Sequence, residues 1–474
     1  MSANAPTSDD QGDLRDEQRL HGRLGPIGVV FMVVAAAAPL TVIGGNMPLG
    51  MGLGNGAGAP VGFLIAALVL LLFSIGFVAM TPYVPEAGAF FSYVTLGLGR
   101  RLGSGIAAVA LIAYTAIQVG IYGYIGWAID DTVRFYGGPE IPWPVYSFAT
   151  LAIVAVLGYR HIELSAKVLG VALALEIGIV VLLDLVIVAN PGPAGLTLSS
   201  FTPGVFTDGV LGIAVLFALT GFIGFEATAV FRDEARDPER TIPRATYAAV
   251  LIIGGFYALT CWAFVVAIGP DQVAEVAQRT LDGEANMLLD TTGDNLGRIG
   301  RDVVNVLLLT SLFACVLSFH NVIARYQFAL ARKGLLPKPL ATVHPSHGSP
   351  SVSSLVQTAT AAVIVAILAA LGIDPLVGVF GSMAGVATVG MVLLMLTTSV
   401  AVLVFFARHA DLASGRVWQT RIAPVLACLG LVGALLLVLT NFTLVTGGSA
   451  TVSAILAAVP FVGLLAGAAR RPRD

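Results

Sequence analysis

Twelve stretches of mostly apolar residues, separated by short polar segments, follow one another along the chain. Most approach the roughly 20 residues that a helix needs to cross the hydrocarbon core of a bilayer. They predict an all-α integral membrane protein with twelve transmembrane helices. We place the predicted spans at residues 27–48, 60–80, 104–129, 144–158, 165–189, 208–231, 243–268, 302–330, 352–371, 380–407, 422–443 and 449–468.

The polar segments between these spans carry an uneven charge. If the N-terminus lies inside, 21 of the 25 Lys and Arg residues fall on the inner side, and the outer side holds only Arg134, Arg279, Arg298 and Arg301. Cytoplasmic loops carry such an excess of basic residues. Both termini are therefore predicted to be cytoplasmic. Residues 1–22 are polar and acidic, which is typical of a disordered tail, and residues 469–474 form a short C-terminal tail.

The composition agrees with a membrane protein and excludes other classes. Apolar residues make up 57% of the chain and charged residues 11%, whereas soluble domains average about 25% charged. A net charge of −3 argues against nucleic acid as a partner. The sequence lacks Walker A, HExxH and GxSxG motifs, so we expect no enzyme activity, cofactor or metal centre. Arg outnumbers Lys 22 to 3, which favours a GC-rich bacterial source and hence the inner membrane of a bacterium.

Two of the predicted spans contain residues that interrupt helices. Pro39 lies in the middle of the first span, where it removes a backbone hydrogen bond. Gly221 and Gly224 lie in the sixth. Each feature alone also fits a simple kink or a helix-packing seam. Together they occupy matching places in two five-helix halves, 27–189 and 208–407, and such paired breaks in inverted repeats indicate a transporter's midplane site.

Three segments resemble motifs of the amino acid–polyamine–organocation (APC) permease superfamily, in particular its bacterial branch of basic amino acid/polyamine antiporter-like proteins. They are GFIGFEATAVFRDEARDPERTIPRA at 221–245, PEAGAFFSYVTLGLGRRLG at 85–103, and ARYQFALARKGLLPKPLATVHPSHGSP at 324–350. The resemblance implies a LeuT-like fold: a 5+5 inverted repeat with broken helices 1 and 6, plus two peripheral helices at 422–468, all within a transporter domain of 23–468. It also implies secondary active transport of amino acids or related amines by alternating access.

The resemblance places the substrate at the two breaks. Many members of the superfamily carry a Gly-Ser-Gly-type break in helix one, whose amides hold the substrate carboxylate. Here the matching positions read Pro39-Leu40-Thr41, which makes an amine without a carboxylate more plausible than is usual in the family. The predicted substrate-binding residues are Ala37, Ala38, Pro39, Leu40, Thr41, Thr220, Gly221, Phe222 and Gly224, with Gln118 and Tyr122 from the third span.

Placing an ionisable side chain inside a membrane span costs free energy, so each such residue is a candidate for a functional role. Glu176 lies nine residues after Lys167, roughly 13 Å into the fifth span at about 1.5 Å per residue. Its carboxyl can carry a proton or pair with a bound cation, or it is a neutral structural group. Glu226 and His320 are further candidates for proton handling, although both also fit structural roles. Ser311 and Ser318 are weak candidates for a sodium site.

The leading hypothesis is a proton-coupled permease that imports amino acids. The first alternative is a permease or exchanger for polyamines or other organic amines, and the second is a membrane sensor that does not transport. The predicted partners are a small amino acid or amine, a coupling proton or sodium ion, and the lipid bilayer. The protein is expected to be a monomer or a homodimer.

Overall fold

The computed structural model describes residues 25–26, 29–30, 33–34, 38–84, 90–160, 166–225, 237–346 and 348–469. None of these residues forms a β-strand. In the part described, nine helices are long and apolar enough to cross a membrane, and two shorter apolar helices accompany them, Trp143–Tyr159 and Leu211–Thr220. The prediction of an all-helical membrane protein is therefore confirmed.

The helices of the first half follow the predicted spans closely. The described part of the first span consists of short α and π segments: α3 Pro39–Thr41, η1 Val42–Asn46, α4 Met47–Gly50 and η2 Met51–Asn55. The later helices are α5 Ala59–Met80, α6 Phe90–Leu98, α7 Arg100–Phe135, α8 Trp143–Tyr159 and α9 Ala166–Ala189.

The second half begins with a short helix and continues with long ones. Its elements are α10 Pro203–Phe206, α11 Leu211–Thr220, α13 Pro238–Ile268, α14 Val273–Leu281, α15 Met287–Arg332, α16 Ser351–Ala370, η8 Pro375–Gly381 and α17 Ser382–Arg408. The chain closes with η9 Trp418–Ile422, α18 Ala423–Thr440, α19 Phe442–Val445 and α20 Ala450–Ala469.

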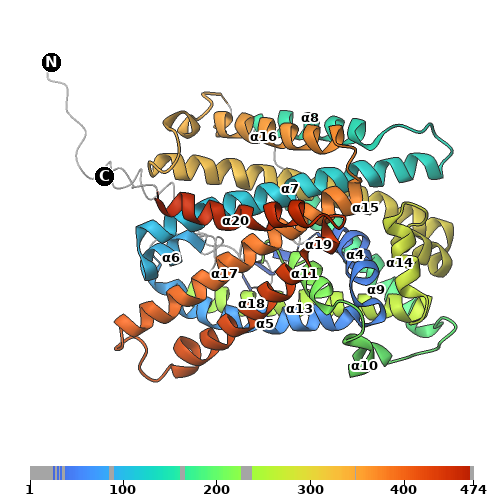
Figure 1. The fold of residues 1–474 in the computed structure, drawn as a ribbon, viewed down its shortest axis with the longest axis horizontal. Helices are drawn as coiled ribbons and strands as arrows, with labels where there is room; N and C mark the ends of the chain where they lie inside the picture. Colours follow the sequence, from blue (N-terminus) through green and yellow to red (C-terminus); the bar gives the residue numbers. More distant parts are fainter. Residues whose placement is uncertain are drawn as a thin grey trace, which may run out of the picture.

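The predicted outer loop near 270–300 is mostly helical. It contains α14 and the first turns of α15, which bends at Gly297, where φ is +71°. Gly52 of η2 lies so close to α14 that a Cβ there would be 2.9 Å from a Leu281 methyl carbon. Figure 1 shows α14 at the end of the bundle opposite to the one where α20 finishes. This segment therefore covers one end of the first span.

Helix α7 packs against α15, α17 and α20, and Figure 1 shows it beside α20 and beneath α8 and α16. Small residues permit the closest of these contacts, because a Cβ at Gly105 would lie 2.6 Å from the Leu464 carbonyl oxygen of α20. Large apolar side chains on α9, α16, α18 and α20 point outward instead, as with Leu185, Ile367, Leu429 and Leu465, each more than 50% exposed. Outward apolar surface of this kind fits contact with lipid.

The charge asymmetry and the position of α14 together give a topology test. Single cysteines at Ser8 and at the exposed Glu284, in a background without Cys261, Cys315 and Cys428, should react oppositely with a membrane-impermeant maleimide in intact cells. We expect labelling at position 284 and protection at position 8 until the cells are lysed. Equal labelling of both positions in intact cells would refute the predicted orientation.

Candidate functional site

The backbone of the first span leaves helical geometry at Ala38. This residue has φ +47° and ψ +74°, in the left-handed region that non-glycine residues seldom occupy. The following proline disfavours the right-handed α region for the residue before it, so a regular helix is disfavoured at Ala38. Pro39 then begins a new helix at the position where its missing N–H costs nothing. The first span is thus interrupted at the position the sequence indicated.

The helix in the sixth predicted span ends beside this point. Helix α11 ends at Thr220 and the chain continues in turns to Phe225, with Gly224 at φ +109°. That conformation favours glycine, because an L side chain is strained there. A Cβ at Gly221 would lie 3.0 Å from Val42 Cγ1. The end of α11 is therefore packed directly on the first helical turns after Pro39, and the two breaks meet.

A small cavity of about 30 Å³ lies where the breaks meet. Its walls come from the first, third, sixth, eighth and tenth predicted spans, and most of the lining is apolar. The lining residues are Thr41, Val42, Asn46, Ile117, Ile121, Thr220, Ile223, Cys315, Phe319 and Phe380. This volume is close to that of one water molecule in the liquid. In this conformation the cavity is too small for an amino acid.

Two of the three polar side chains in this lining are satisfied within the protein. Thr220 Oγ1 and Thr388 Oγ1 share a hydrogen bond of 2.5 Å, and Asn46 Nδ2 donates to the Phe217 carbonyl oxygen at 2.9 Å. Thr41 Oγ1 is buried and has no hydrogen-bond partner among the described residues. Leaving a buried hydroxyl unpaired costs about 1–3 kcal/mol. Thr41 is therefore the lining group best placed to bind a ligand.

Glu176 of α9 reaches the first break from the side. Its carboxylate oxygen Oε2 accepts hydrogen bonds from the Leu40 backbone N–H at 3.5 Å and from Ser311 Oγ at 3.0 Å. The side chain is 4% exposed. Ser311 lies one turn before the cavity residue Cys315 on α15, and Leu40 precedes the cavity residue Thr41. One carboxyl group thus joins α9, the start of α3 and α15 at the edge of the cavity.

The sequence profile of the family described as "Amino acid permease" matches residues 24–465. The chain belongs to the amino acid permease family.

Several bacterial transporters are similar to this permease over most of its length. The branched-chain amino acid permease BcaP of Bacillus subtilis is 27% identical over 346 residues, which cover 67% of this chain and 71% of the relative. The serine/threonine exchanger SteT of the same species is 22% identical over 353 residues, covering 72% and 76%. The methylthioribose transporter of Bacillus subtilis is 23% identical over 424 residues, which cover 83% of this chain and 85% of the relative. The predicted membership of the APC superfamily is therefore confirmed.

The predicted binding residues of the third span lie beside the permease's cavity without lining it. Gln118 is fully buried; its Oε1 accepts from Gln357 Nε2 at 2.7 Å, and its Nε2 donates to the Val316 carbonyl oxygen at 3.4 Å. Tyr122 is also buried, and its carbonyl oxygen accepts from Ser147 Oγ at 2.6 Å. The lining face of α7 is instead the neighbouring one, which carries Ile117 and Ile121.

Three other predicted residues point elsewhere. Phe222 packs toward α13, where its ring centroid lies 6.5 Å from that of Tyr257. His320 Nε2 lies 2.9 Å from Ser354 Oγ of α16. Ser318 is exposed on the surface of α15, whereas Ser311 of the same helix contacts Glu176. Ala37 and Glu226 lie outside the described residues.

Of the ten residues that line the cavity, only Thr41 and Thr220 were predicted from the sequence, and Asn46 and Phe380 illustrate why the others were missed. Asn46 is the one polar side chain in the apolar run 42–54. A lone amide in such a run indicates a residue with a polar partner or ligand, so the sequence contained a signal for it. Phe380 lies more than 330 positions away in η8, and no local pattern distinguishes it from other apolar residues. Only the packing of η8 against α7 and the first span brings it to the cavity.

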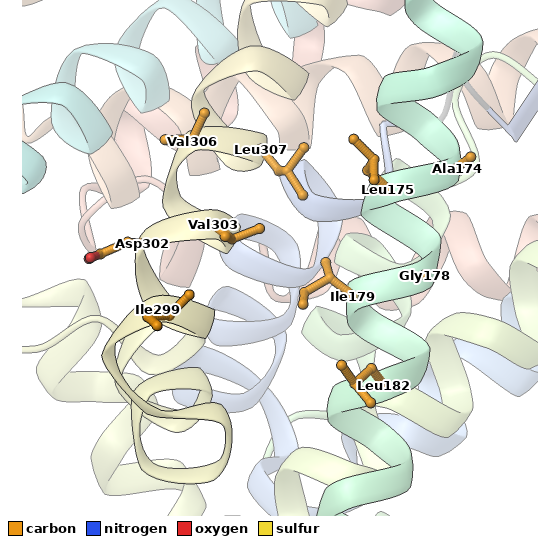
Figure 2. Close-up of a pocket in the computed structure, with 10 residues that line it drawn as sticks. All are labelled: Ala174, Leu175, Gly178, Ile179, Leu182, Ile299, Asp302, Val303, Val306 and Leu307. Carbon is orange, nitrogen blue, oxygen red and sulfur yellow. The ribbon is translucent and has the colours of Figure 1, made fainter.

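A larger hollow between α9 and α15 is a different feature. Figure 2 shows a groove of about 580 Å³ between α9 and α15, lined by apolar side chains such as Leu175, Ile179, Val303 and Val306. Val306 is 60% exposed and Leu175 55% exposed. The groove therefore opens outward toward lipid, and Glu176 points away from it toward α3. We do not assign it to the transport site.

Gly44 and Gly45 permit the contacts that close the cavity. A Cβ at Gly45 would lie 2.8 Å from ring carbons of both Phe380 and Tyr124, and these two rings are themselves packed with centroids 5.1 Å apart. Both rings are almost fully buried and have little room to move. The glycine is required here because of this close approach.

We predict that Gly45→Ala destabilises the permease by about 1–3 kcal/mol, the usual effect of overpacking. Thermal unfolding of the purified protein in detergent should show a lower midpoint. The matched control is Gly178→Ala on α9, where a Cβ meets no atom within 4 Å and alanine is the better helix former. Equal midpoints for the two variants would contradict the crowding at Gly45.

Proposed function

We propose that this permease imports amino acids with apolar side chains, by alternating access at the cavity between the two breaks. The observation that carries the proposal is the make-up of the lining. Side chains of Val42, Ile117, Ile121, Ile223, Phe319 and Phe380 surround the cavity, and no carboxylate is among the lining residues. Apolar walls with a few placed polar groups suit an aliphatic or aromatic side chain.

The polar end of such a substrate has partners at the breaks. Interrupted helices expose backbone amides at one half-helix end and carbonyls at the other, which suit a carboxylate and an ammonium group. The unpaired hydroxyl of Thr41 lies at the first break, and Thr220 and Gly221 lie at the second. The named substrates of two relatives, branched-chain amino acids and serine or threonine, share this zwitterionic end.

An organic amine is the alternative substrate. It is favoured by Pro39-Leu40-Thr41 in place of a glycine-rich break and by Glu176 near that break. A polycation, however, requires several anionic partners, and the described lining offers none. Glu176 is already engaged with Leu40 and Ser311. We therefore place the zwitterion first.

Alternating access accounts for the size of the cavity. A volume near 30 Å³ holds about one water molecule, so loading requires the walls to separate. In our proposal the halves 27–189 and 208–407 form inverted repeats within twelve spans, and both termini are cytoplasmic. Rocking of one part against the other around a fixed central site is the usual route in such transporters.

We further propose that Glu176 couples transport to a proton. It is buried, and none of the ion pairs in the described part of the chain involves it. A full charge held there without a cation is costly, so the carboxyl loses its proton when the surrounding helices open to water. Because Oε2 contacts the Leu40 N–H, gain or loss of the proton changes the contact between α9 and the first break.

The substrate class is tested by uptake of labelled leucine into proteoliposomes. Unlabelled isoleucine, valine and phenylalanine should compete strongly, serine weakly, and putrescine or ethanolamine not at all. Ile121→Ala removes part of the apolar wall and should raise the KM for leucine about tenfold, in the range for lost methylene contacts, while changing that for alanine little. Ile125→Ala is the control, since Ile125 is equally buried one turn away and does not line the cavity.

Two outcomes would redirect the proposal. Competition by putrescine but not by isoleucine would make the amine the substrate. Equal effects of Ile121→Ala and Ile125→Ala on the KM for leucine would move the binding site away from this cavity.

The coupling role is tested with Glu176→Gln, which preserves size and most hydrogen bonding but cannot change charge. We expect loss of leucine accumulation driven by a pH gradient, with exchange of internal for external leucine retained. Asp184→Asn is the control, because Asp184 lies on the same helix, is 5% exposed and accepts a hydrogen bond of 2.7 Å from Thr260. Unchanged gradient-driven accumulation in Glu176→Gln would remove this residue from coupling, and loss of exchange as well would assign it to binding or structure.

A further inference from the structure

A second outward groove lies at the end of the bundle where α20 finishes. Its volume is about 270 Å³. Its walls are α7 from Ser104 to Ile112, Leu330 and the pair Leu335–Leu336 around the end of α15, and α20 from Gly463 to Gly467. Apart from Ser104, the lining carries no polar side chain. Figure 1 shows the ends of α7 and α20 together at this side of the molecule, near α6.

Small residues create the groove. A Cβ at Gly467 would lie 2.7 Å from the Ser104 carbonyl oxygen, so α20 and α7 are in backbone contact at this point. Beside that contact, Ala108 and Ala466 are too short to fill the space up to Leu335 and Leu336. The result is a narrow apolar slot that opens to the lipid side of the bundle. Its shape suits an acyl chain, and the charge around it decides which lipid fits.

All the charged residues on the segments that form this groove are cationic. Residues 90–112, 325–346 and 450–469 contain no Asp or Glu, and they contain Arg100, Arg101, Arg325, Arg332, Lys333 and Lys338. Arg100 and Arg101 begin α7, one turn before Ser104, whose hydroxyl donates to the Arg100 carbonyl oxygen at 2.9 Å. Both arginines are exposed, and neither takes part in an ion pair within the described part of the chain.

We propose that this groove is a specific site for an anionic phospholipid. One acyl chain lies in the slot between α7 and α20, and the phosphate is held by Arg100 and Arg101 at its mouth. Basic pockets between transmembrane helices are the usual sites for anionic head groups. The groove between α9 and α15 differs in this respect, because the charged residue in its lining is Asp302. The proposal does not depend on the transported substrate.

Binding is measured by titrating delipidated, detergent-purified permease with phosphatidylglycerol, or with phosphatidylcholine of the same acyl chains, and counting bound lipids by native mass spectrometry. We expect one phosphatidylglycerol to bind more tightly than any phosphatidylcholine. A basic residue near an anionic lipid contributes about fivefold in affinity. Arg100→Gln/Arg101→Gln should therefore weaken phosphatidylglycerol binding by about thirtyfold and leave phosphatidylcholine unchanged. Equal binding of the two lipids by the wild type would overturn the proposal.

A charge-matched control separates a site from general attraction. Arg416→Gln/Arg421→Gln removes two exposed cations, one just before η9 and one within it; neither lines the groove, and η9 packs against α5, α17 and α18. This variant should bind phosphatidylglycerol like the wild type. If it loses as much affinity as Arg100→Gln/Arg101→Gln, the lipid responds to net charge alone and the site does not exist.

A steric pair tests the slot itself. Ala466→Phe places a ring in the groove from an exposed position on α20, whereas Val462→Phe places one on the same helix outside the lining. We expect phosphatidylglycerol binding to be lost in the first variant and kept in the second, with both proteins unfolding at similar temperatures. Wild-type affinity in Ala466→Phe would show that no acyl chain lies there.

Discussion

The structure depends on the need of every backbone polar group for a partner in a medium without water. A helix supplies those partners internally, so a membrane helix that stops in mid-span must find others. At Ala38 and Pro39 the helix of the first span stops, and the Leu40 N–H turns to Glu176 on another helix. At Thr220 the sixth span stops, and short-range turns carry the chain to Phe225. In our proposal the substrate lies between these two helix ends, where the backbone no longer forms regular helical hydrogen bonds.

Around this site the remaining helices form a frame held by buried polar contacts. Gln118 of α7, Gln327 of α15 and Gln357 of α16 are joined by side-chain hydrogen bonds of 2.7 and 3.2 Å. His320 adds a further link from α15 to Ser354 of α16. Polar residues inside spans are costly unless they are hydrogen-bonded, and here each of these side chains makes at least one hydrogen bond to another helix. They stabilise the wall against which the broken helices pack and leave the cavity itself mostly apolar.

Small residues set the distances in this arrangement. Gly45 brings the first span against Tyr124 and Phe380, Gly221 brings the sixth span against Val42, and Gly467 brings α20 against α7. Without a hydrophobic force between helices in lipid, close packing of this kind is a main source of association. Because these residues are small, they also leave unfilled space, which forms the cavity between the breaks and the grooves at the surface. The polarity and charge of the residues around each cavity or groove then determine which molecules it can bind.

The sequence by itself determined the helical membrane class, and it pointed to Pro39 and to Gly221 and Gly224 as places where a helix is disturbed, because these signals are local. Hydropathy over 20 residues and a proline or paired glycines within it have the same consequence in almost any neighbourhood. The tertiary structure decided which side chains meet at the breaks. Asn46, Ile117, Ile121 and Phe380 reach the cavity, while Gln118 and Tyr122 face away. Successive residues of a helix point about 100° apart, so a small rotation of the helix changes which side chains face the cavity. Only the packing of all the helices together fixes that rotation.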